Sequence, residues 1–452
     1  MNTATLSSPL SITLLVLLGT LFVLYALSAL WWLYEVFVLS RNRDRDRDRD
    51  AEAFEWGLED VQVRILTVDG KRVVQGTVDA VPSAIDDVHV IAEAPMDVSG
   101  ATVHVVPEEF DCEATNKGRA LEWASRTLQC EKEYVLYLDE DTIVTDFTGV
   151  PDADVVQFTE LPIYTGSWFT YCCEVFRVGY QFEQFGFPRL RYPLYAWGGG
   201  IAIRRDLEER IGWDVGTVTE DTNFVWRAAR EKGFSFRVVD ARFRNQAPPT
   251  ISAMIRQRRR WISGSLQDGG ILPLSYRPLY GTRVVVWACS PLVLIWILGV
   301  VVDTGTAGLP TRAFGGISAA LAVVLVVFMW FGIRAYRLEP YLWPAFLLAT
   351  PLAVVLHAAG AAWGIVSPVS EFQVTEKIPP ETVETVNPAL ERGDIRAHDG
   401  TESLVGEGPQ ASETGGKVEV EVEVEREDEV EEQEHEQKQK QEQEGDRARP
   451  LD

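Results

Sequence analysis

Four long apolar runs set the main constraint on how this chain of 452 residues folds. They lie at residues 10–39, 284–302, 313–333 and 342–366. A helix needs about 20 predominantly apolar residues to cross the hydrocarbon core of a bilayer, and the last three runs contain no Asp, Glu, Lys or Arg. The sequence therefore predicts one N-terminal membrane anchor and three transmembrane helices within 284–366, with the lipid bilayer as a partner.

The flanks of these runs predict where the rest of the chain lies. Residues 1–50 combine the anchor with an Arg/Asp linker, in which arginines are interleaved with aspartates. No small-residue cleavage site follows the apolar stretch closely, so we expect a retained anchor and not a signal peptide. Arginines beside membrane helices favour the cytoplasmic side, although a solvated low-complexity linker would have the same composition. We expect a multi-pass protein of the plasma membrane with a cytoplasmic domain at 55–275.

Charge and cysteine content exclude several other classes of protein. The formal net charge is -25, and nucleic acid is not an expected partner, because its phosphate backbone needs a basic surface. Much of the negative charge lies in residues 379–452, which are poor in large apolar side chains and are predicted to be an acidic disordered tail. The five cysteines form no C-x-x-C pair, so neither a disulfide framework nor a zinc site is expected.

Residues 55–275 are predicted to form an α/β domain. The apolar segments with the length of strands are 61–68, 88–92, 101–106 and 134–138. A helical segment is predicted at 114–128, between the third and fourth of these strands. Strands that alternate with helices imply a mostly parallel sheet, and such sheets bind their ligands beyond the carboxyl ends of the strands. We therefore look for the functional residues at those ends.

Three acidic residues, Asp139-Glu140-Asp141, directly follow the predicted strand at 134–138. Carboxylates gathered at one place repel each other unless a cation binds, and hard oxygen ligands suit Mg²⁺ or Mn²⁺ that bridges to substrate phosphates. Alternation along an extended chain would point Asp139 and Asp141 to one side and Glu140 to the other. The alternative is an acidic turn on an acidic protein.

Two further motifs follow. Thr-Glu-Asp at 219–221 precedes a helical segment at 222–232, where acidic residues also occur for capping and helix-dipole reasons alone. Gln-Arg-Arg-Arg-Trp at 257–261 joins guanidinium groups to an indole. Arginine can clamp a diphosphate through paired hydrogen bonds, and an indole can stack on a sugar ring. The alternative for this motif is a basic and aromatic belt at a membrane surface.

The order of these three motifs, just ahead of membrane spans, resembles that of the processive type of family 2 glycosyltransferases, which include the cellulose, chitin and hyaluronan synthases. Lys117-Gly118-Arg119-Ala120-Leu121 resembles the family's K-x-x-A-L segment near the nucleotide diphosphate. The run at 197–261 is most similar to the egghead-type β-mannosyltransferases. The resemblance implies a GT-A fold and a membrane-bound, inverting transferase that moves a sugar from a nucleotide-diphosphate sugar, with GDP-mannose as a candidate donor.

The resemblance also implies roles for individual residues. It implies Asp221 as the catalytic base with Glu220 beside it, and Asp139 and Asp141 as the residues that hold Mg²⁺ or Mn²⁺. The residues implied for binding the nucleotide-sugar are Thr67, Asp69, Glu93, Lys117, Arg119 and Glu140. The residues implied for binding the diphosphate and the acceptor are Trp197, Gly198, Gly199, Gly200, Gln257, Arg260 and Trp261.

The chain also departs from the family pattern. Its first strand runs into Thr67-Val68-Asp69-Gly70 where the family has a Tyr-Asn-Glu-like turn, and Glu93 stands where the family places Asp, so the nucleotide stays open. The acceptor is either a lipid-linked sugar or a polysaccharide, and the small number of spans favours few additions to a lipid-linked acceptor. The alternative function is a non-catalytic membrane scaffold that retains the glycosyltransferase fold.

Overall fold

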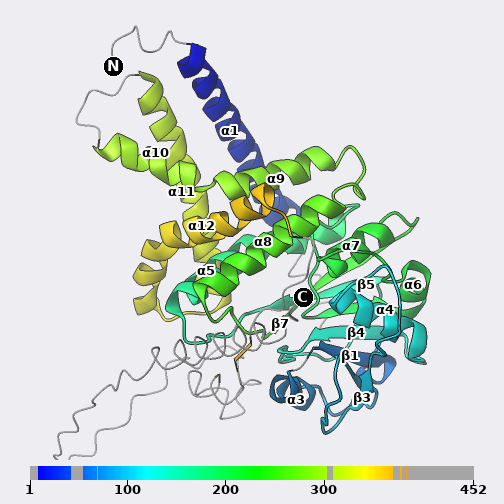
Figure 1. The fold of residues 1–452 in the computed structure, drawn as a ribbon. Helices are drawn as coiled ribbons and strands as arrows, with labels where there is room; N and C mark the ends of the chain where they lie inside the picture. Colours follow the sequence, from blue (N-terminus) through cyan, green and yellow to red (C-terminus); the bar gives the residue numbers. More distant parts are fainter. Residues whose placement is uncertain are drawn as a thin grey trace, which may run out of the picture. The chain divides into compact units, whose positions relative to one another are not determined.

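The computed structural model of this chain describes residues 9–41, 54–68, 70–302, 309–369, 377–378 and 383. The Arg/Asp linker, Asp69 and, apart from residue 383, the predicted acidic tail lie outside the described residues. The described part contains an α/β domain and a set of long apolar helices (Figure 1).

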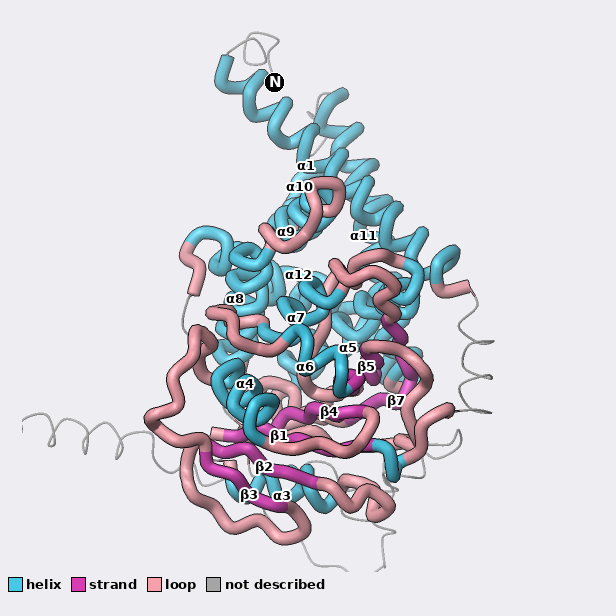
Figure 2. Tube along the Cα trace, turned by 90° about the vertical axis from the view of Figure 1, so that its right-hand side faces the viewer, coloured by secondary structure: helices cyan, strands magenta, loops and turns pink. Residues whose placement is uncertain are grey.

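Seven strands form one sheet in the order β3-β2-β1-β4-β6-β5-β7 (Figures 1 and 2). Their bounds are Val61–Thr67 (β1), Val88–Ala92 (β2), Thr102–Val105 (β3), Tyr134–Asp139 (β4), Val155–Glu160 (β5), Ile201–Arg204 (β6) and Phe236–Phe243 (β7). Neighbouring strands pair in parallel, except that β6 is antiparallel to both β4 and β5. All strands but β6 therefore end at the same edge of the sheet, and β6 begins there. The predicted α/β class with a mostly parallel sheet is confirmed.

Helices cover both faces of this sheet, so every residue of β1 is buried, and so is every residue of β4 except Asp139. The helices are α3 (Lys71–Asp79), α4 (Lys117–Thr127), α6 (Arg205–Ile211) and α7 (Glu220–Ala228), with a short 3-10 turn, η3 (Leu58–Asp60), ahead of β1. Val61, Val63 and Ile65 of β1 pack in one core with α3. Val135 and Tyr137 of β4 pack in the other core, with α4, α6 and α7. Alternation of side chains along each strand fills the two cores.

Long apolar helices form the second part of the described chain. They are α1 (Pro9–Tyr34) with the π-helical turn η2 (Glu35–Leu39), α9 (Arg277–Cys289), α10 (Pro291–Val302), α11 (Leu309–Ala335), and α12 (Trp343–Val366) with the turn η5 (Pro340–Leu342) ahead of it. Among the described residues, three segments are long and apolar enough to cross a membrane: Val16–Leu39, Gly315–Ala335 and Pro340–Val366. The prediction of one continuous helix at 284–302 is wrong. The chain breaks between α9 and α10 at Pro291, whose ring has no N–H to continue a helix.

Two helices join the sheet domain to the apolar helices. α5 (Trp168–Tyr180), which runs into the 3-10 segment η4 (Gln181–Arg189), packs against α11 and α12, and α8 (Ile251–Asp268) packs against α12 (Figure 1). Glycines permit this close packing: a Cβ added to Gly332 of α11 would collide with the carbonyl oxygen of Val175 on α5, and one added to Gly364 of α12 would lie 2.8 Å from the carbonyl oxygen of Arg259 on α8. The apolar helices are thereby fixed against α5 and α8.

Candidate active site

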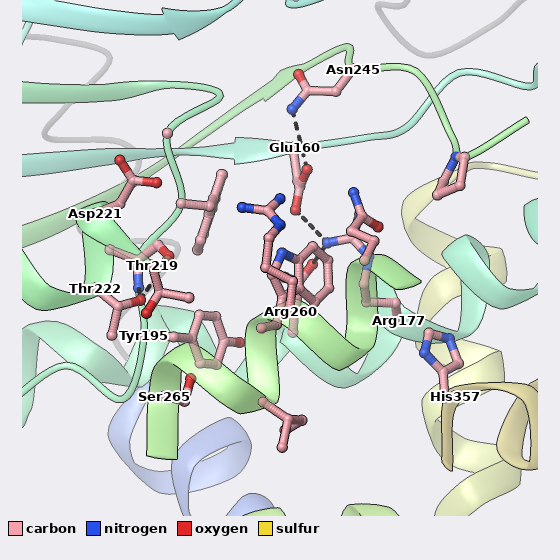
Figure 3. A pocket seen from close by; sticks show the side chains of 18 of the residues that line it. Glu160, Arg177, Tyr195, Thr219, Asp221, Thr222, Asn245, Arg260, Ser265 and His357 are labelled. Atoms are coloured by element: carbon pink, nitrogen blue, oxygen red, sulfur yellow. Dashed lines mark hydrogen bonds and ion pairs between the residues drawn. The ribbon is translucent and has the colours of Figure 1, made fainter. Parts of the chain in front are cut away.

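A cavity of about 670 Å³ lies at the sheet edge where the strands end, and it extends to α5, α8 and the apolar helices. Figure 3 shows part of its wall, with Asp221, Thr219 and Thr222 on one side and Glu160 and Arg177 on the other. Nearly all the site residues predicted from the sequence line this cavity. The exceptions are Gly199 and Gly200, which are absent from its wall, and Asp69, which lies outside the described residues.

Lys117, the first residue of α4, lies among the acidic side chains of the cavity. Its Nζ is 2.8 Å from Asp139 Oδ1, 3.4 Å from Glu220 Oε1 and 3.6 Å from Asp221 Oδ2. Burial alone would lower the pKa of Lys117, but these carboxylates raise it, because each stabilises the ammonium group. Burial would likewise raise the pKa of Asp139, yet Lys117 lowers it. Lys117 therefore stays charged and joins the end of β4 to the start of α7.

Whereas the pKa of Asp139 is lowered, the pKa of Asp221, in the first turn of α7, is raised. Burial has the largest effect on its carboxyl group, and Glu220 and Asp139 add to it, so that the pKa of Asp221 is raised to about 7 although Lys117 and Arg260 oppose the shift. The side chain of Thr219 makes no capping hydrogen bond, whereas Glu220 and Asp221 lie in the first turn of α7, where the helix dipole favours carboxylates. A carboxyl group that titrates near neutral pH is suited to accept a proton from a substrate hydroxyl.

Asp139 and Asp141 are the predicted metal ligands. Asp141 is buried, and its Oδ2 accepts hydrogen bonds from the backbone N–H of Gln246, at 2.8 Å, and from Nζ of Lys377, at 2.6 Å. Its Oδ1 is buried and has no hydrogen-bond partner in the described part of the chain, which is unfavourable for a carboxylate unless a cation binds there. The described residues contain no group of three or more such ligands. Mg²⁺, however, commonly binds through one or two carboxylates plus waters and substrate phosphates, so this pair fits a divalent ion.

The predicted opposite orientation of Glu140 is wrong. β4 ends at Asp139, so strand alternation does not reach the next two residues, and all three acidic side chains line the cavity. Glu140 Oε2 accepts a hydrogen bond from Oγ1 of Thr67, at 2.6 Å, at the end of β1. Burial raises the pKa of Glu140.

Lys377 is a site residue that sequence reasoning did not find. It lies beyond α12, and the neighbouring Ile378 is held by two hydrogen bonds of 2.9 Å with the side chain of Gln246. Burial would lower the pKa of Lys377, but Asp141 raises it. The sequence distinguishes Lys377 only by its place shortly after the last apolar run, which is too weak a signal to assign it to a site that begins more than two hundred residues earlier.

The three glycines ahead of β6, residues 198–200, have two different structural roles. Gly198 lines the cavity, and a Cβ there would collide with Nζ of Lys117 and lie 3.0 Å from both carboxylate oxygens of Asp221. Gly200 has φ +152° and packs against the ring of Phe243, and Gly199 packs against Asn245. Gly198 therefore allows the backbone to approach the charged centre, whereas Gly199 and Gly200 pack behind it.

The Gln-Arg-Arg-Arg-Trp motif lies on α8, with Gln257, Arg260 and Trp261 on the cavity wall. Nη1 of Arg260 donates a hydrogen bond to the carbonyl oxygen of Val218, at 3.4 Å, and burial lowers its pKa while Glu220 and Asp139 oppose that shift. In Figure 3 the guanidinium group of Arg260 projects from α8 toward the sheet edge. A fixed positive charge therefore faces the acidic end of the cavity.

Buried ion pairs behind Trp261 were not predicted either. Arg258 and Arg177 stack on its ring, with their guanidinium carbons 4.1 Å and 5.6 Å from the ring centroid. Both arginines pair with Glu174 of α5, and Arg177 also pairs with Glu160 at the end of β5. These contacts hold the indole in place. Sequence patterns could not find them, because the partners lie far apart in the chain and on helices that the motifs do not cover.

Glu93 and Arg119 lie together at the end of β2. Nη1 of Arg119 donates a hydrogen bond to Oε2 of Glu93, at 3.0 Å, and its Nε donates to the carbonyl oxygen of Phe110, at 3.1 Å. Both side chains line the cavity. Together with Thr67 they form the side of the cavity at the ends of β1 and β2, where a parallel sheet of this kind binds a nucleotide.

Comparison with known proteins identifies the family. The model of glycosyl transferase family group 2 matches residues 134–366, which is more than half of the chain. The chain belongs to this family. The match runs from β4 to the end of α12, so it includes the acidic triplet, the Thr-Glu-Asp motif, the Gln-Arg-Arg-Arg-Trp helix and two of the candidate spans. The family 2 resemblance, the GT-A fold class and the assignment as a glycosyltransferase are confirmed, and the non-catalytic scaffold is not supported.

Two curated relatives agree with the egghead-type resemblance. The chain is 24% identical over 308 residues to beta-1,4-mannosyltransferase egh of Drosophila melanogaster, covering 60% of this chain and 66% of that protein. It is 24% identical over 213 residues to beta-1,4-mannosyltransferase bre-3 of Caenorhabditis elegans, covering 42% of this chain and 46% of that protein. Glucosyl-3-phosphoglycerate synthase from Mycobacterium tuberculosis, solved with Mg²⁺ and uridine-diphosphate, aligns with a TM-score of 0.32 and 16% identity over 50% of this chain and 83% of that chain.

Proposed function

We propose that this glycosyltransferase moves a hexosyl group, with inversion, from a nucleotide-diphosphate sugar to an acceptor held at the membrane. One observation carries the proposal: Lys117 joins Asp139 and Asp221 inside a cavity that also contains Arg260 and Trp261. This arrangement provides a base, fixed positive charges and an aromatic surface within one cavity. The whole activity of the relatives is carried over as a proposal, because the chain spans only 66% and 46% of the lengths of the relatives compared.

The reaction is assigned to named side chains. The acceptor hydroxyl gives its proton to the carboxylate of Asp221 while its oxygen forms a bond to C1 of the sugar, on the side opposite the diphosphate. The bond between C1 and the diphosphate oxygen breaks, and its electron pair leaves with the nucleoside diphosphate. Arg260 and Lys117 stabilise the negative charge that develops there. Trp261, fixed by Arg258 and Arg177, provides a surface on which the acceptor sugar stacks.

Asp139 and Asp141 would hold a divalent cation, Mg²⁺ or Mn²⁺. Such an ion neutralises charge on a diphosphate leaving group when it is bound. The unpartnered Oδ1 of Asp141 supports this assignment. Lys377 contacts the other oxygen of the same carboxylate, so the cation and Lys377 would neutralise Asp141 together.

The donor is proposed to be GDP-mannose. The support is the printed function of the two curated relatives, both beta-1,4-mannosyltransferases. The nucleotide would lie along Thr67, Glu93 and Arg119 at the ends of β1 and β2, with Glu140 beside Thr67. The acceptor is proposed to be a lipid-linked sugar, since the cavity continues from Asp221 to the apolar helices, and a polysaccharide is the second candidate. The site would face the cytoplasm at the plasma membrane, where nucleotide sugars are dissolved.

The test is donor turnover by the purified full-length protein in detergent, measured as released nucleoside diphosphate. A panel of GDP-mannose, GDP-glucose, UDP-glucose and dTDP-glucose is compared in Mg²⁺, in Mn²⁺ and in EDTA. We expect turnover of GDP-mannose that is abolished by EDTA and by Asp141→Ala, but not by the exposed control Asp79→Ala. Turnover that survives both EDTA and Asp141→Ala would overturn the metal assignment, and preference for a UDP or dTDP sugar would overturn the donor.

A further inference from the structure

A buried carboxylate outside the cavity, that of Asp268, contacts the chain segment that carries the proposed base. Asp268 is the last residue of α8, the helix on which Arg260 lies. The residue is 8% exposed and is absent from the cavity wall, so it does not touch a substrate. Its hydrogen bonds all go to residues around Asp221, so any effect on the reaction acts through that segment.

Asp268 accepts three hydrogen bonds from residues 217–223. Its Oδ2 accepts from Oγ1 of Thr217, at 2.6 Å, and from Oγ1 of Thr219, at 3.2 Å. Its Oδ1 accepts from Nδ2 of Asn223, at 2.8 Å. Burial raises the pKa of Asp268, and these three hydrogen bonds oppose the shift, because each stabilises the carboxylate. The donors lie on both sides of Glu220-Asp221 in the sequence, so Asp268 holds the start of α7 at two points.

The hydroxyl group of Thr219 is used differently from that of most threonines in its position. Thr219 is the N-cap of α7, where a threonine oxygen normally accepts from a backbone N–H of the first turn. Thr219 makes no such bond, and its hydroxyl donates to Asp268 instead. A Cβ added to Gly264 of α8 would lie 2.4 Å from Oγ1 of Thr219. The start of α7 is therefore fixed by contact with α8 and not by a cap of its own.

The same contact sets the position of Asp221 relative to Arg260. Nη1 of Arg260 donates to the carbonyl oxygen of Val218, at 3.4 Å, within the segment that Asp268 holds. Figure 3 shows Thr219 and Asp221 together on one side of the cavity, with Arg260 of α8 beside them. A general base must stay within hydrogen-bond reach of the proton that it takes, and a displacement of about 1 Å can cost about a hundredfold in rate.

The partners of Asn223 explain why residue 268 is a carboxylate and not an amide. Oδ1 of Asn223 accepts from Nε of Arg227, at 2.8 Å, and the two Nη atoms of Arg227 donate to the carbonyl oxygens of Ile211 and Gly212. The amide of Asn223 is thereby oriented with its NH₂ group toward Asp268. An amide at residue 268 would bring a second NH₂ group against either Asn223 or the two threonine hydroxyls.

We propose that Asp268 is a positioning residue for the transfer reaction. It holds Thr217, Thr219 and Asn223 so that Asp221 stays within reach of the acceptor hydroxyl and at a fixed distance from Arg260. This inference rests on the proposed function and adds to it a residue outside the cavity on which the rate of transfer depends.

Thr217→Val and Thr217→Ser form the first test, since Thr217 is also absent from the cavity wall. Valine keeps the shape of the side chain but cannot donate to Asp268, whereas serine keeps the hydroxyl group. We expect kcat of Thr217→Val to fall about three- to tenfold, the effect of one lost hydrogen bond, with the donor KM unchanged. Thr217→Ser should stay within about twofold of the wild type in both.

The exchange of Asp268 and Asn223 is the second test. Asp268→Asn opposes two NH₂ groups or disturbs the threonines, and Asn223→Asp opposes two carboxylates, so each should lower kcat about 10- to 100-fold. The double variant Asp268→Asn, Asn223→Asp again pairs an NH₂ group with a carboxylate, and Arg227 can still donate to residue 223. We expect its kcat to return to within about threefold of the wild type.

All variants are compared as full-length protein in detergent, by release of nucleoside diphosphate from GDP-mannose or, if another donor of the panel above reacts faster, from that donor. The rate is divided by the number of folded sites, counted by binding of the same nucleoside diphosphate, so that a loss of folded protein alone does not change kcat. A wild-type kcat in Thr217→Val, a raised donor KM with kcat retained, or a double variant no faster than the single ones overturns the inference. A wild-type protein that turns over no donor contradicts the proposed function, and the role of Asp268 with it.

Discussion

The active-site cavity has two walls, the sheet edge where the strands end and a helical wall formed by α5 and α8. The two walls differ in how far their charged side chains are exposed and paired. At the sheet edge the charged side chains are partly open to the cavity: the side chain of Asp139 is 37% exposed, and those of Lys117 and Asp221 are 14% and 13% exposed. On the helical wall, Arg258 and Glu174 form an ion pair with side-chain exposures of 0% and 2%. The sheet-edge charges remain able to exchange partners with a ligand, whereas Arg258 and Glu174 are already paired with each other.

The open charges of the sheet edge are suited to catalysis, whereas the buried ion pairs of the helical wall support the structure. A carboxylate that keeps an open side can bind a cation or accept a proton, as Asp139 and Asp221 are placed to do. A fully buried ion pair gives little net stability, but the loss of one partner is costly because the other is left charged in a dry site. We therefore expect substitutions at the sheet edge to lower catalysis with little effect on stability, and substitutions on the helical wall to lower stability first.

The largest effect is expected for Asp221→Asn. The amide cannot take the proton of the acceptor hydroxyl, and loss of a general base typically lowers the rate about 10²- to 10⁴-fold. Because the shape of the side chain is retained and the amide carries no buried charge, the thermal midpoint at neutral pH should be no lower than that of the wild type. Transfer rate at saturating donor and acceptor, and thermal unfolding in the same detergent, are the two measurements.

The control is Asp206→Asn, the same exchange at an exposed residue of α6 that pairs with Arg210 on the surface. Both the transfer rate and the thermal midpoint of this control should match the wild type. If Asp221→Asn turns over as fast as Asp206→Asn, then Asp221 is not the base, and the distinction between the two walls fails at its most important residue.

The next effect is expected for Glu174→Ala on the helical wall. The change leaves Arg258 and Arg177 with a lost partner in a buried site, for which a loss of about 3–5 kcal/mol in stability is typical. Trp261, against which both guanidinium groups stack, also loses its fixed position, so transfer should fall together with stability. The shift of the thermal midpoint of the full-length protein checks the first expectation, and the acceptor KM checks the second.

Glu209→Ala provides the comparison for this variant, because Glu209 pairs with Arg205 on the surface and its side chain is 62% exposed. A surface pair of this kind contributes about 1 kcal/mol or less, so the control should unfold close to the wild type. A Glu174→Ala protein as stable as Glu209→Ala would show that the buried pairs are not what supports the helical wall.

The same contrast explains how much the sequence could predict. Asp139 directly follows the predicted strand at 134–138, so the rule that parallel strands end at one edge places it where ligands bind. The placement of Asp221 and Arg260 in the same site came from the order of the motifs, which resembles that of the family. The direction of Glu140 was missed because the point where β4 ends is not visible in the sequence. The break of the 284–302 run is not evident from length and hydropathy, because the run is long and apolar enough for one helix and only the ring of Pro291 marks the break.

Residues of the helical wall could not be predicted in the same way. Glu174 and Arg177 lie on α5, which carries no recognised motif, and their partners come from α8 and β5. His357, which lies in the last apolar run, accepts from Nε of Arg258 at 3.2 Å, a contact across 99 residues. Such pairs depend on how helices pack, and packing follows from glycines such as Gly332 and Gly364 that have no distinctive neighbours in the sequence.

The smallest expected effect is a pH dependence that comes from the sheet edge alone. Burial, with Glu220 and Asp139, raises the pKa of Asp221 to about 7 against the opposing effects of Lys117 and Arg260. A base must be deprotonated to act, so kcat/KM should fall about tenfold for each pH unit below 7 and level off above it.

Because the raised pKa means that the folded protein binds this proton more tightly than the unfolded chain, the contribution of Asp221 to stability should decline as pH rises from about 4 to 7. Asp221→Asn removes this contribution, whereas Glu174→Ala keeps it. A pH profile of kcat/KM that is flat between 5 and 8 would place the titrating base elsewhere, and a pH dependence of the thermal midpoint that survives in Asp221→Asn would assign that proton to another group of the sheet edge.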